Sequence, residues 1–403
     1  MTSFQVIIIS FFCLILVGTL LLMLPISSRQ RCVTSFPDAM FTAVSATCVT
    51  GLVVKDTATY WSLFGQAVIL MLIQIGGMGV ITIGLAIIRA SGRKIGLRQR
   101  STMQESISAP QVGGIVKLTG FILKTSLIIE MIGAALLAPV FCNDLGIAKG
   151  LWYSLFHSIS AFCNAGFDLF GIREPFSSLT FYHSNIYLNI IIMLLIITGG
   201  IGFLVWGDIR THKHRIRRFS LQSKVVLMTS AVLIVLPALY FFFYEYDRET
   251  IHDRTIHSLF QSVTTRTAGG MKTATFAVLF LSAITVLRRR NDVQCFKRRI
   301  SNETVCSAGA VLFMYLVLFF TSGIIISRVE NLPLLTCLFE TSSAIGTVGL
   351  TLGITSGLSA VSRVILMILM FFGRVGGLTL IYAALPSADS QNSRLPLEKI
   401  SIG

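Results

Sequence analysis

The feature that most constrains this chain is a series of long apolar runs, each close to the length that crosses a lipid bilayer as a helix. A span needs about 20 consecutive apolar residues. Only 13% of this 403-residue chain is charged, against about 25% in a typical soluble domain. The composition therefore predicts an all-α, multi-pass integral membrane protein. The expected spans are Phe4–Leu24, Ser62–Ile88, Leu118–Phe141, Ile186–Trp206, Val225–Phe243, Ala308–Ile326 and Val364–Leu385.

The formal net charge of +15 at pH 7 could indicate nucleic-acid binding, but the basic residues follow the apolar spans. They gather in three short segments, residues 89–100, 210–218 and 288–299. Such basic loops remain on the cytoplasmic side of a membrane, where they also attract anionic headgroups. We therefore expect contact with the lipid bilayer and no nucleic-acid partner.

Four shorter apolar stretches lie between the spans, and each leads into a small-residue turn that contains glycine. Segments of about 10–14 apolar residues are more typical of re-entrant helices than of spans. The stretches are Phe36–Ala46, Leu151–Phe162, Ile256–Val263 and Leu334–Ser343. Their turns read TCVTGL (Thr47–Leu52), FCNAGF (Phe162–Phe167), TRTAGG (Thr265–Gly270) and GTVGLT (Gly346–Thr351). A second glycine cluster lies in each following span: IGGMG (75–79), TGGIG (198–202), AGGMK (268–272) and FGRVGG (372–377).

The order of span, short helix, glycine turn and span therefore occurs four times. Small residues also let membrane helices pack closely, so a single cluster would indicate no more than packing. Repetition at equivalent places favours a repeated unit, and units that cannot bury their polar faces alone assemble together. The predicted units are residues 1–100, 101–218, 219–300 and 301–403, the last with the C-terminal tail.

The glycine turns also predict a chemistry. Irregular backbone within a membrane is tolerated only where it is buried in protein or lines a watery cavity. Four such turns around one axis would gather carbonyl oxygens that can replace the hydration shell of an alkali cation. The negative C-terminal end of each short helix would favour a cation there. The turns contain no carboxylate, which argues against a filter for divalent ions.

The segments SATCVTGL, SAFCNAGF, TTRTAG and SAIGTVGL resemble the four filter loops of the Ktr/Trk/HKT superfamily of potassium transporters, and the Ktr-type membrane subunit is the most similar. GGMKTATFAV and FFGRVGGLTL resemble its third and fourth inner helices, and PLEKISIG resembles its C-terminal segment. The resemblance implies a pseudo-fourfold pore in one chain of the bacterial inner membrane, with potassium as the transported ion and sodium as an activator. It also implies a homodimer, a cytosolic nucleotide-binding ring as regulatory partner, and no organic cofactor in this chain.

The same resemblance assigns the potassium-binding backbone carbonyls position by position, in what we call the four filter loops. The assigned residues are Thr47, Cys48, Val49, Thr50 and Gly51; Cys163, Asn164, Ala165 and Gly166; Arg266, Thr267, Ala268 and Gly269; and Gly346, Thr347, Val348 and Gly349.

Five further side chains carry individual predictions. Arg374 and Lys272 are assigned to a gate below the filter, with the alternative that Arg374 caps the carbonyls of a neighbouring helix. Arg266 is predicted to brace the third filter loop from behind. Glu130 is predicted to pair with a polar group of another helix. Asn164 either offers an oxygen near the axis or makes an ordinary loop hydrogen bond.

The third unit is shorter than the others. The filter glycine and the first glycine of the next cluster are 25 residues apart in the first unit, 33 in the second and 24 in the fourth, whereas Gly269 occupies both positions in the third. The 18 residues from Gly270 to Leu287 reach only about 27 Å as a helix. We therefore expect the third unit to lack the outer half of its second span near Gly269–Gly270. In the family this part carries a flexible loop that gates the pore, so its loss would leave transport ungated, leaky or abolished. The sequence leaves open whether the loss is natural, engineered or an error in the recorded sequence.

Three other functions stay open. A secondary transporter of another solute also uses broken helices, but typically with inverted repeats, whereas these units run in one direction. A non-transporting membrane protein and a transport-impaired variant are both compatible with the short third unit. An enzyme is not expected, because the chain contains no HExxH, nucleophile elbow or phosphate-binding loop.

Overall fold

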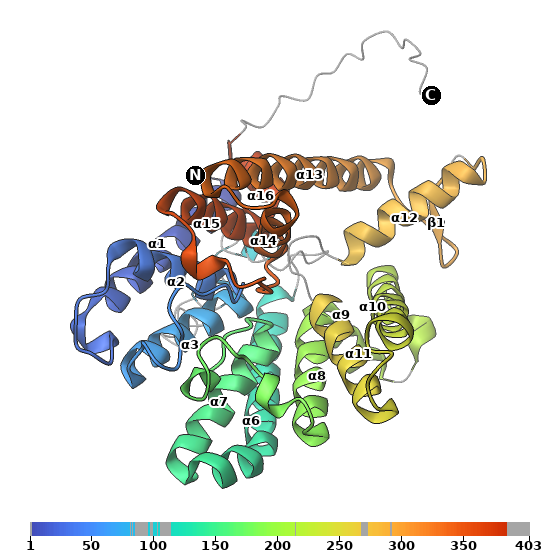
Figure 1. Cartoon of the computed structure of the whole chain (residues 1–403). Helices are drawn as coiled ribbons and strands as arrows, with labels where there is room; N and C mark the ends of the chain where they lie inside the picture. The colour runs from blue at the N-terminus through green and yellow to red at the C-terminus, as the bar shows by residue number, and fades with distance from the viewer. Residues whose placement is uncertain are drawn as a thin grey trace.

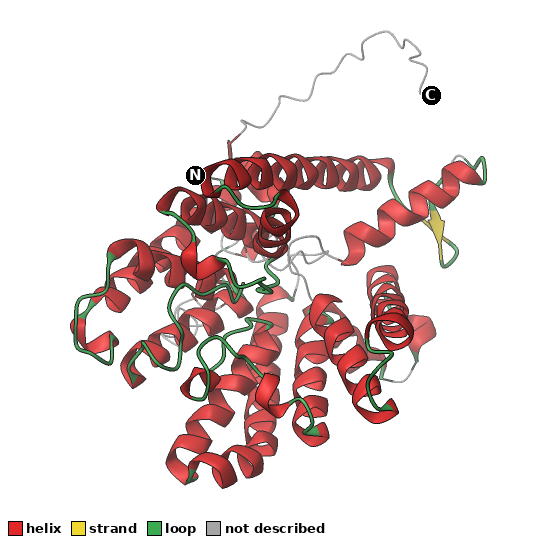
Figure 2. Cartoon of the chain, viewed as in Figure 1, coloured by secondary structure: helices red, strands yellow, loops and turns green. Residues whose placement is uncertain are grey.

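The computed structural model describes residues 2–80, 82, 84, 96, 100–102, 104, 114–213, 215–266, 273–290 and 292–384. Nearly all regular structure in this part of the chain is helical (Figure 2). The α-helices are α1 Ser3–Met23, α2 Phe36–Cys48, α3 Leu63–Met78, α6 Ile115–Leu145, α7 Ile147–Cys163, α8 Ile186–Gly200, α9 Phe203–His212, α10 Leu221–Tyr240, α11 Ile251–Arg266, α12 Thr273–Leu287, α13 Asn302–Glu330, α14 Leu334–Gly346, α15 Ala360–Val375 and α16 Gly377–Ala384. Short turns are η1 Pro25–Ser27, η2 Phe170–Ile172, η3 Thr180–Tyr182, η4 Ile216–Arg218, the π-helical η5 Phe241–Glu245 and η6 Thr355–Gly357. Strands β1 Gln294–Cys295 and β2 Arg298–Arg299 form one hairpin.

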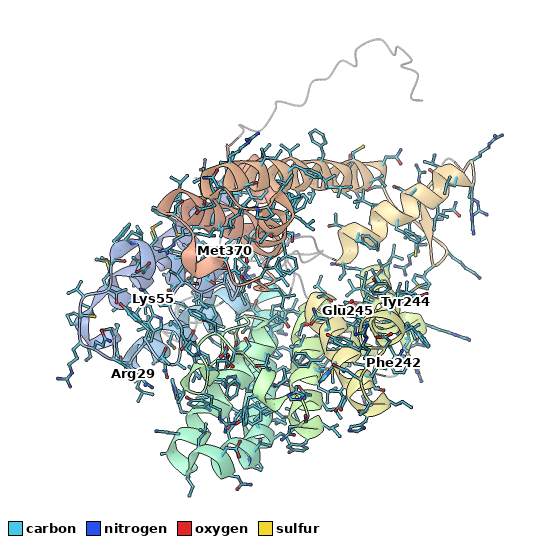
Figure 3. All side chains as sticks on the ribbon, viewed as in Figure 1. Arg29, Lys55, Phe242, Tyr244, Glu245 and Met370 are labelled. Carbon is cyan, nitrogen blue, oxygen red and sulfur yellow. The ribbon has the colours of Figure 1, made fainter. Side chains whose placement is uncertain are left out.

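The long helices have the length and composition of membrane spans. Among the described residues, four helices are long and apolar enough to cross a bilayer: α1, α6, Leu221–Glu245 and α13. Large apolar side chains stay exposed along them, as on Phe12, Met131 and Phe313, and side chains project outward along the periphery of the ribbon (Figure 3). A soluble protein rarely exposes so much contiguous apolar surface, whereas lipid accepts it. The described part of the chain is therefore that of a multi-pass membrane protein, as the composition predicted.

The helices pack in a recurring order (Figure 1). Each of the long helices α1, α6, α10 and α13 packs against the short helix that follows it, namely α2, α7, α11 and α14. Helices α2, α7 and α14 pack in turn against α3, α8 and α15. Those three helices also reach the next unit, because α3 packs on α7, α8 on α11, and α15 on α2.

Two of the short helices, α2 and α14, begin at the predicted residues, Phe36 and Leu334. In α2, the Ser35 side chain accepts a hydrogen bond from the Asp38 amide, and Pro37 lies in the first turn. Serine at the N-cap and proline in the first turn are typical helix starts. The stretch predicted from Leu151 begins earlier in the structure, at Ile147, after Gly146, which makes no side-chain capping bond.

The second spans are broken, and here the prediction of continuous helices was wrong. Helices α8 and α9 meet at 90°, while α3 ends before Gly79 and α15 before Gly376. The break residues Gly79, Gly202 and Gly376 have φ of 89°, 92° and 89°, values that glycine adopts without steric cost. Each of these glycines stands three residues after the first glycine of its cluster. The Gly-x-x-Gly spacing was therefore a sequence signal for the helix breaks, and the sequence analysis missed it.

Helix α12 differs from its counterparts. It packs against α10 and α13, and Ala277 is its one buried residue. Among the described residues it makes no comparable contact with α11 or α14. Its packing therefore differs from that of α3, α8 and α15, each of which contacts two of the short helices.

Candidate functional site

The filter loops that the structure describes end their helices with the same backbone geometry. Helices α2, α7 and α14 are each followed by a left-handed residue, Val49, Asn164 and Thr347, with φ of 58°, 59° and 49°. The amide of the next residue then bonds back to a serine carbonyl in the last turn. The distances are 2.9 Å for Thr50 N to Ser45 O, 2.8 Å for Ala165 N to Ser160 O, and 2.9 Å for Val348 N to Ser343 O. This pattern is a Schellman-type helix end, and it turns the following carbonyls away from the helix.

The glycines one residue later bring the three loops together. Gly51, Gly166 and Gly349 have φ of 92°, 70° and 85°. A Cβ on Gly51 would lie 2.5 Å from the Ala165 carbonyl oxygen and 3.1 Å from the Gly166 Cα. A Cβ on Gly349 would lie 3.1 Å from the Gly51 Cα. The three loops therefore meet at one point, where no side chain larger than hydrogen fits at Gly51 or Gly349. Figure 2 shows loop segments at this middle region, below α14 and above α7.

A second set of glycines lets the broken spans pack against the filter helices. A Cβ on Gly76 would collide with the Thr47 carbonyl oxygen, and one on Gly199 would collide with that of Phe162. In the same way, a Cβ on Gly373 would collide with the Ile345 carbonyl oxygen. The three contacts recur at corresponding places in the three units, so these clusters serve close helix packing.

Several buried oxygens near the loops have no hydrogen-bond partner among the described residues. They are the side-chain oxygens of Thr47, Thr50, Asn164 and Ser343. Leaving a buried polar atom unpaired is costly, and such atoms need an explanation. The Asn164 oxygen thus makes no ordinary loop hydrogen bond within the described part of the chain. The three loops carry no charged side chain, so their oxygens offer the ligand chemistry of a dehydrated monovalent cation.

Arg374 lies below the loops, in the last turn of α15. Its guanidinium donates one hydrogen bond to the Gly76 carbonyl oxygen and another, of 3.0 Å, to that of Gly77. Carbonyls at a helix C-terminus lack intrahelical partners. Arg374 donates to two of them at the end of α3, of which the Gly76 carbonyl also accepts from the Gly79 amide over 3.3 Å. The capping geometry that was the structural alternative is therefore present, while a role in gating stays a prediction.

Glu130 has the polar partner that was predicted. It is 1% exposed on α6, and the Gln74 amide nitrogen on α3 lies 3.0 and 2.9 Å from its two carboxylate oxygens. The Ser158 hydroxyl of α7 donates to the Glu130 backbone carbonyl over 2.6 Å. Three helices from two units therefore meet at this polar contact.

Part of the predicted site lies outside the described residues. The structure does not describe Thr267, Ala268, Gly269 or Lys272. It describes the backbone of Arg266, which ends α11, but not the Arg266 side chain. Their assignments to the filter and gate remain predictions.

Sequence reasoning also passed over two residues, His157 and Glu340, which accept hydrogen bonds from backbone amides three residues beyond the filter glycines. Each stands three residues before the serine of its loop. This recurrence is visible in the sequence, but the two positions share no residue type, so no motif drew attention to them.

Comparisons with known proteins agree with this geometry. The family model described as TrkH, cation transport protein, matches residues 1–287 and 267–393. The chain belongs to the TrkH family of cation transport proteins. The resemblance stated from the filter loops is thereby confirmed, and the family is one of transporters rather than enzymes.

Curated members of the TrkH family match almost the whole chain. The potassium/sodium uptake protein NtpJ of Enterococcus hirae is 35% identical over 442 residues, covering 99% of this chain and 97% of that protein. The Ktr system potassium uptake protein B of Bacillus subtilis is 37% identical over 437 residues, covering 99% and 96%. The crystal structure of the potassium transporter TrkH from Vibrio parahaemolyticus has a TM-score of 0.70 at 16% identity, covering 95% of this chain and 85% of that one.

Proposed function

We propose that this protein takes up potassium across the bacterial inner membrane through a filter of backbone carbonyls. The observation that carries the proposal is the meeting of Gly51, Gly166 and Gly349, each just beyond a helix C-terminus whose dipole favours a cation. The unpaired oxygens of Thr50 and Asn164 would add ligands. The names of the relatives, a potassium/sodium uptake protein and a Ktr system potassium uptake protein, support potassium as cargo and sodium as a second ion.

We infer that four units, residues 1–100, 101–218, 219–300 and 301–403, surround one pore in pseudo-fourfold order. The order of helix packing supports this, because the helix after each filter loop packs on the short helix of the next unit. Helix α3 packs on α7, α8 packs on α11, and α15 of the fourth unit packs on α2 of the first. Among the described residues, the link from the third unit to α14 is the missing one. The third filter loop would complete the ring with the carbonyls of residues 266–269.

The third unit lacks the segment between filter and break that the other units possess. Three observations support this proposal. Gly269 is both the filter glycine and the first glycine of the next cluster, whereas 33 residues separate these two positions in the second unit. The two matches of the family model overlap at residues 267–287. The alignment with NtpJ runs over 442 residues although it covers 99% of a 403-residue chain, so about forty of its positions have no residue of this chain opposite them.

The same family membership supports a regulated assembly. Relatives named as parts of Ktr systems support a partner protein, which we propose to be a cytosolic nucleotide-binding ring on a homodimer of this chain. Arg374 and Lys272 would stand at the gate below the filter. With the third unit shortened, an alternative outcome is a transport-impaired protein that keeps the fold.

Complementation of a potassium-uptake-deficient bacterium at submillimolar potassium tests the proposal. We expect growth with the wild-type chain, or restored growth after about 30 residues from a relative are reinserted between Gly269 and Gly270. Gly51→Ala should abolish growth in whichever chain supports it, because its Cβ collides with the second loop. Gly353→Ala is the matched control, since Gly353 has a similar φ of 87° but open space at Cβ. Well-expressed chains that never support growth, with or without the insertion, would refute potassium uptake.

A further inference from the structure

A buried histidine ties the second filter loop to its own helix. The Leu169 amide, three residues after Gly166, donates to His157 Nε2 over 3.2 Å. His157 Nδ1 lies 2.7 Å from the Tyr153 carbonyl oxygen, which can only accept, so Nδ1 carries the proton and Nε2 is the acceptor. The Phe170 ring stacks on the imidazole at 4.4 Å and 27°. His157 is 4% exposed, so water does not compete for the Leu169 amide.

A buried glutamate makes the same connection in the fourth filter loop. The Leu352 amide, three residues after Gly349, donates to Glu340 Oε1 over 3.1 Å. The Thr355 hydroxyl donates to Oε2 over 2.9 Å, and the Thr351 hydroxyl also donates to Oε1. Glu340 is 0% exposed and takes part in no ion pair with another described residue.

The two contacts are equivalent although the residues differ. Each acceptor stands three residues before the serine of its loop, and each donor amide stands twelve residues after the acceptor. In the first unit this place belongs to Thr42, whose hydroxyl donates to the Asp38 carbonyl of its own helix over 2.9 Å. In the third it belongs to Phe260, which has no acceptor. Two chemically different side chains, His157 and Glu340, thus accept a hydrogen bond from the equivalent backbone amide in two of the four units.

These two hydrogen bonds concern the stiffness of the filter. Before each glycine, the Schellman-type bonds fix the backbone, and after it the bond to His157 or Glu340 fixes the backbone again. The filter carbonyls between these two points have little freedom to move. If discrimination between potassium and sodium rests on a snug fit, it depends on the spacing and stiffness of the coordinating carbonyls, because a loose ring can close around the smaller ion.

We propose that His157 and Glu340 are positioning residues that set the preference of this filter for potassium over sodium. The inference rests on the proposed potassium filter and deepens it. The residues touch no ion; they act through the amides of Leu169 and Leu352. Glu340 is a buried acceptor group that only hydrogen bonds satisfy among the described residues.

The test uses variants that remove the acceptor of each loop amide; Glu340→Leu also removes the acceptor of the Thr351 and Thr355 hydroxyls. In His157→Asn, the introduced amide nitrogen replaces Nδ1, and the Leu169 amide loses its acceptor. In His157→Gln, the introduced amide oxygen lies near the position of Nε2, so the Leu169 amide keeps an acceptor. Glu340→Leu removes the acceptor for Leu352, and Glu340→Gln keeps one oxygen for it. Thr42→Val is the matched control, because Thr42 is also buried at the equivalent place but its side chain bonds to its own helix rather than to a filter loop.

Two readouts are needed for each purified full-length variant and for cells that express it. The first is the concentration of potassium, or of sodium, that half-maximally raises the melting temperature in detergent, since a bound ion stabilises the folded state. The second is the ratio of potassium to sodium uptake. Losing the hydrogen bond to the loop amide should lower the potassium preference about tenfold in His157→Asn, and at least as much in Glu340→Leu, which loses two further bonds. His157→Gln and Glu340→Gln should retain most of it, and Thr42→Val all of it.

The outcomes separate the two proposals. A wild-type chain that prefers potassium, with variants that keep the full preference, overturns the positioning role alone. The same holds if Thr42→Val loses preference as much as the others do. A wild-type chain without potassium preference in either readout overturns the proposed function and this inference with it. If His157→Asn does not fold, the Glu340→Leu and Glu340→Gln pair decides by the same criteria.

Discussion

Replacing Gly199 with alanine should separate the two helices that hold the second filter loop. The added Cβ would collide with the Phe162 carbonyl oxygen and lie 2.8 Å from its carbon, so α8 must move away from α7. Overpacking of this kind costs about 1–3 kcal/mol, and the upper end applies because the obstacle is backbone rather than a side chain. Alanine returns up to about 1 kcal/mol of helix propensity. The expected net loss is therefore about 2 kcal/mol.

Gly309→Ala is the matched control for this prediction. Gly309 also lies inside a helix, but a Cβ there would meet nothing within 4 Å. This variant should gain stability, by up to about 1 kcal/mol. The two alanine variants should therefore differ by about 3 kcal/mol, in opposite directions from the wild type.

Thermal unfolding of the purified protein in detergent measures the difference. Tryptophan emission gives a local reading as well, because the Trp206 ring packs edge-on against Phe162 at 6.2 Å and 86°. We expect Gly199→Ala to melt at lower temperature with a shifted emission spectrum, and Gly309→Ala to melt at the wild-type temperature or above. A Gly199→Ala protein that melts like Gly309→Ala, with unchanged emission, would refute the close approach of α8 to α7.

Three further changes test other contacts. Arg374→Ala should lower the melting temperature, because the carbonyls at the end of α3 lose a buried donor worth about 1–3 kcal/mol; unchanged uptake and voltage dependence in the same variant would exclude a gating role. Glu130→Leu should destabilise by about 1–3 kcal/mol because the Gln74 amide loses its acceptor, and Glu130→Gln should cost less; equal melting temperatures would contradict this pairing. Gly349→Ala should reduce potassium uptake to background while Gly353→Ala does not, as measured with a rubidium tracer.

The filter loops could be predicted from the sequence because their requirements are local. A short apolar helix with a glycine-bearing turn after it indicates a helix end, whatever surrounds it, whereas the left-handed backbone of Val49 and Thr347 could not be predicted, because β-branched residues rarely adopt it. The pattern of short helix and glycine turn identified the loops containing Gly51, Gly166 and Gly349. The breaks at Gly79, Gly202 and Gly376 were equally local, but a glycine in an apolar run fits close packing as well as a kink, so the pattern was ambiguous.

The contacts between units could not be predicted in this way. Arg374 and the carbonyls of Gly76 and Gly77 are about 300 residues apart in the chain, and no periodicity relates them. The sequence left Arg374 between two roles, and only the packing of α15 near the end of α3 put a carbonyl at its guanidinium. Gln74 was likewise one of many polar residues that could pair with Glu130 until α3 and α6 were placed in space.

The sequence by itself determined that this chain is a helical membrane protein with repeated glycine turns, because hydropathy and turn geometry depend on neighbours along the chain. Tertiary structure decided which turns meet, which glycines face backbone, and that His157 and Glu340 reach the same kind of amide. These features depend on distances between residues that are far apart in the sequence. Because the interior is crowded and excludes water, it allows close contact only where glycine has no Cβ, and a buried amide there needs an acceptor from the protein.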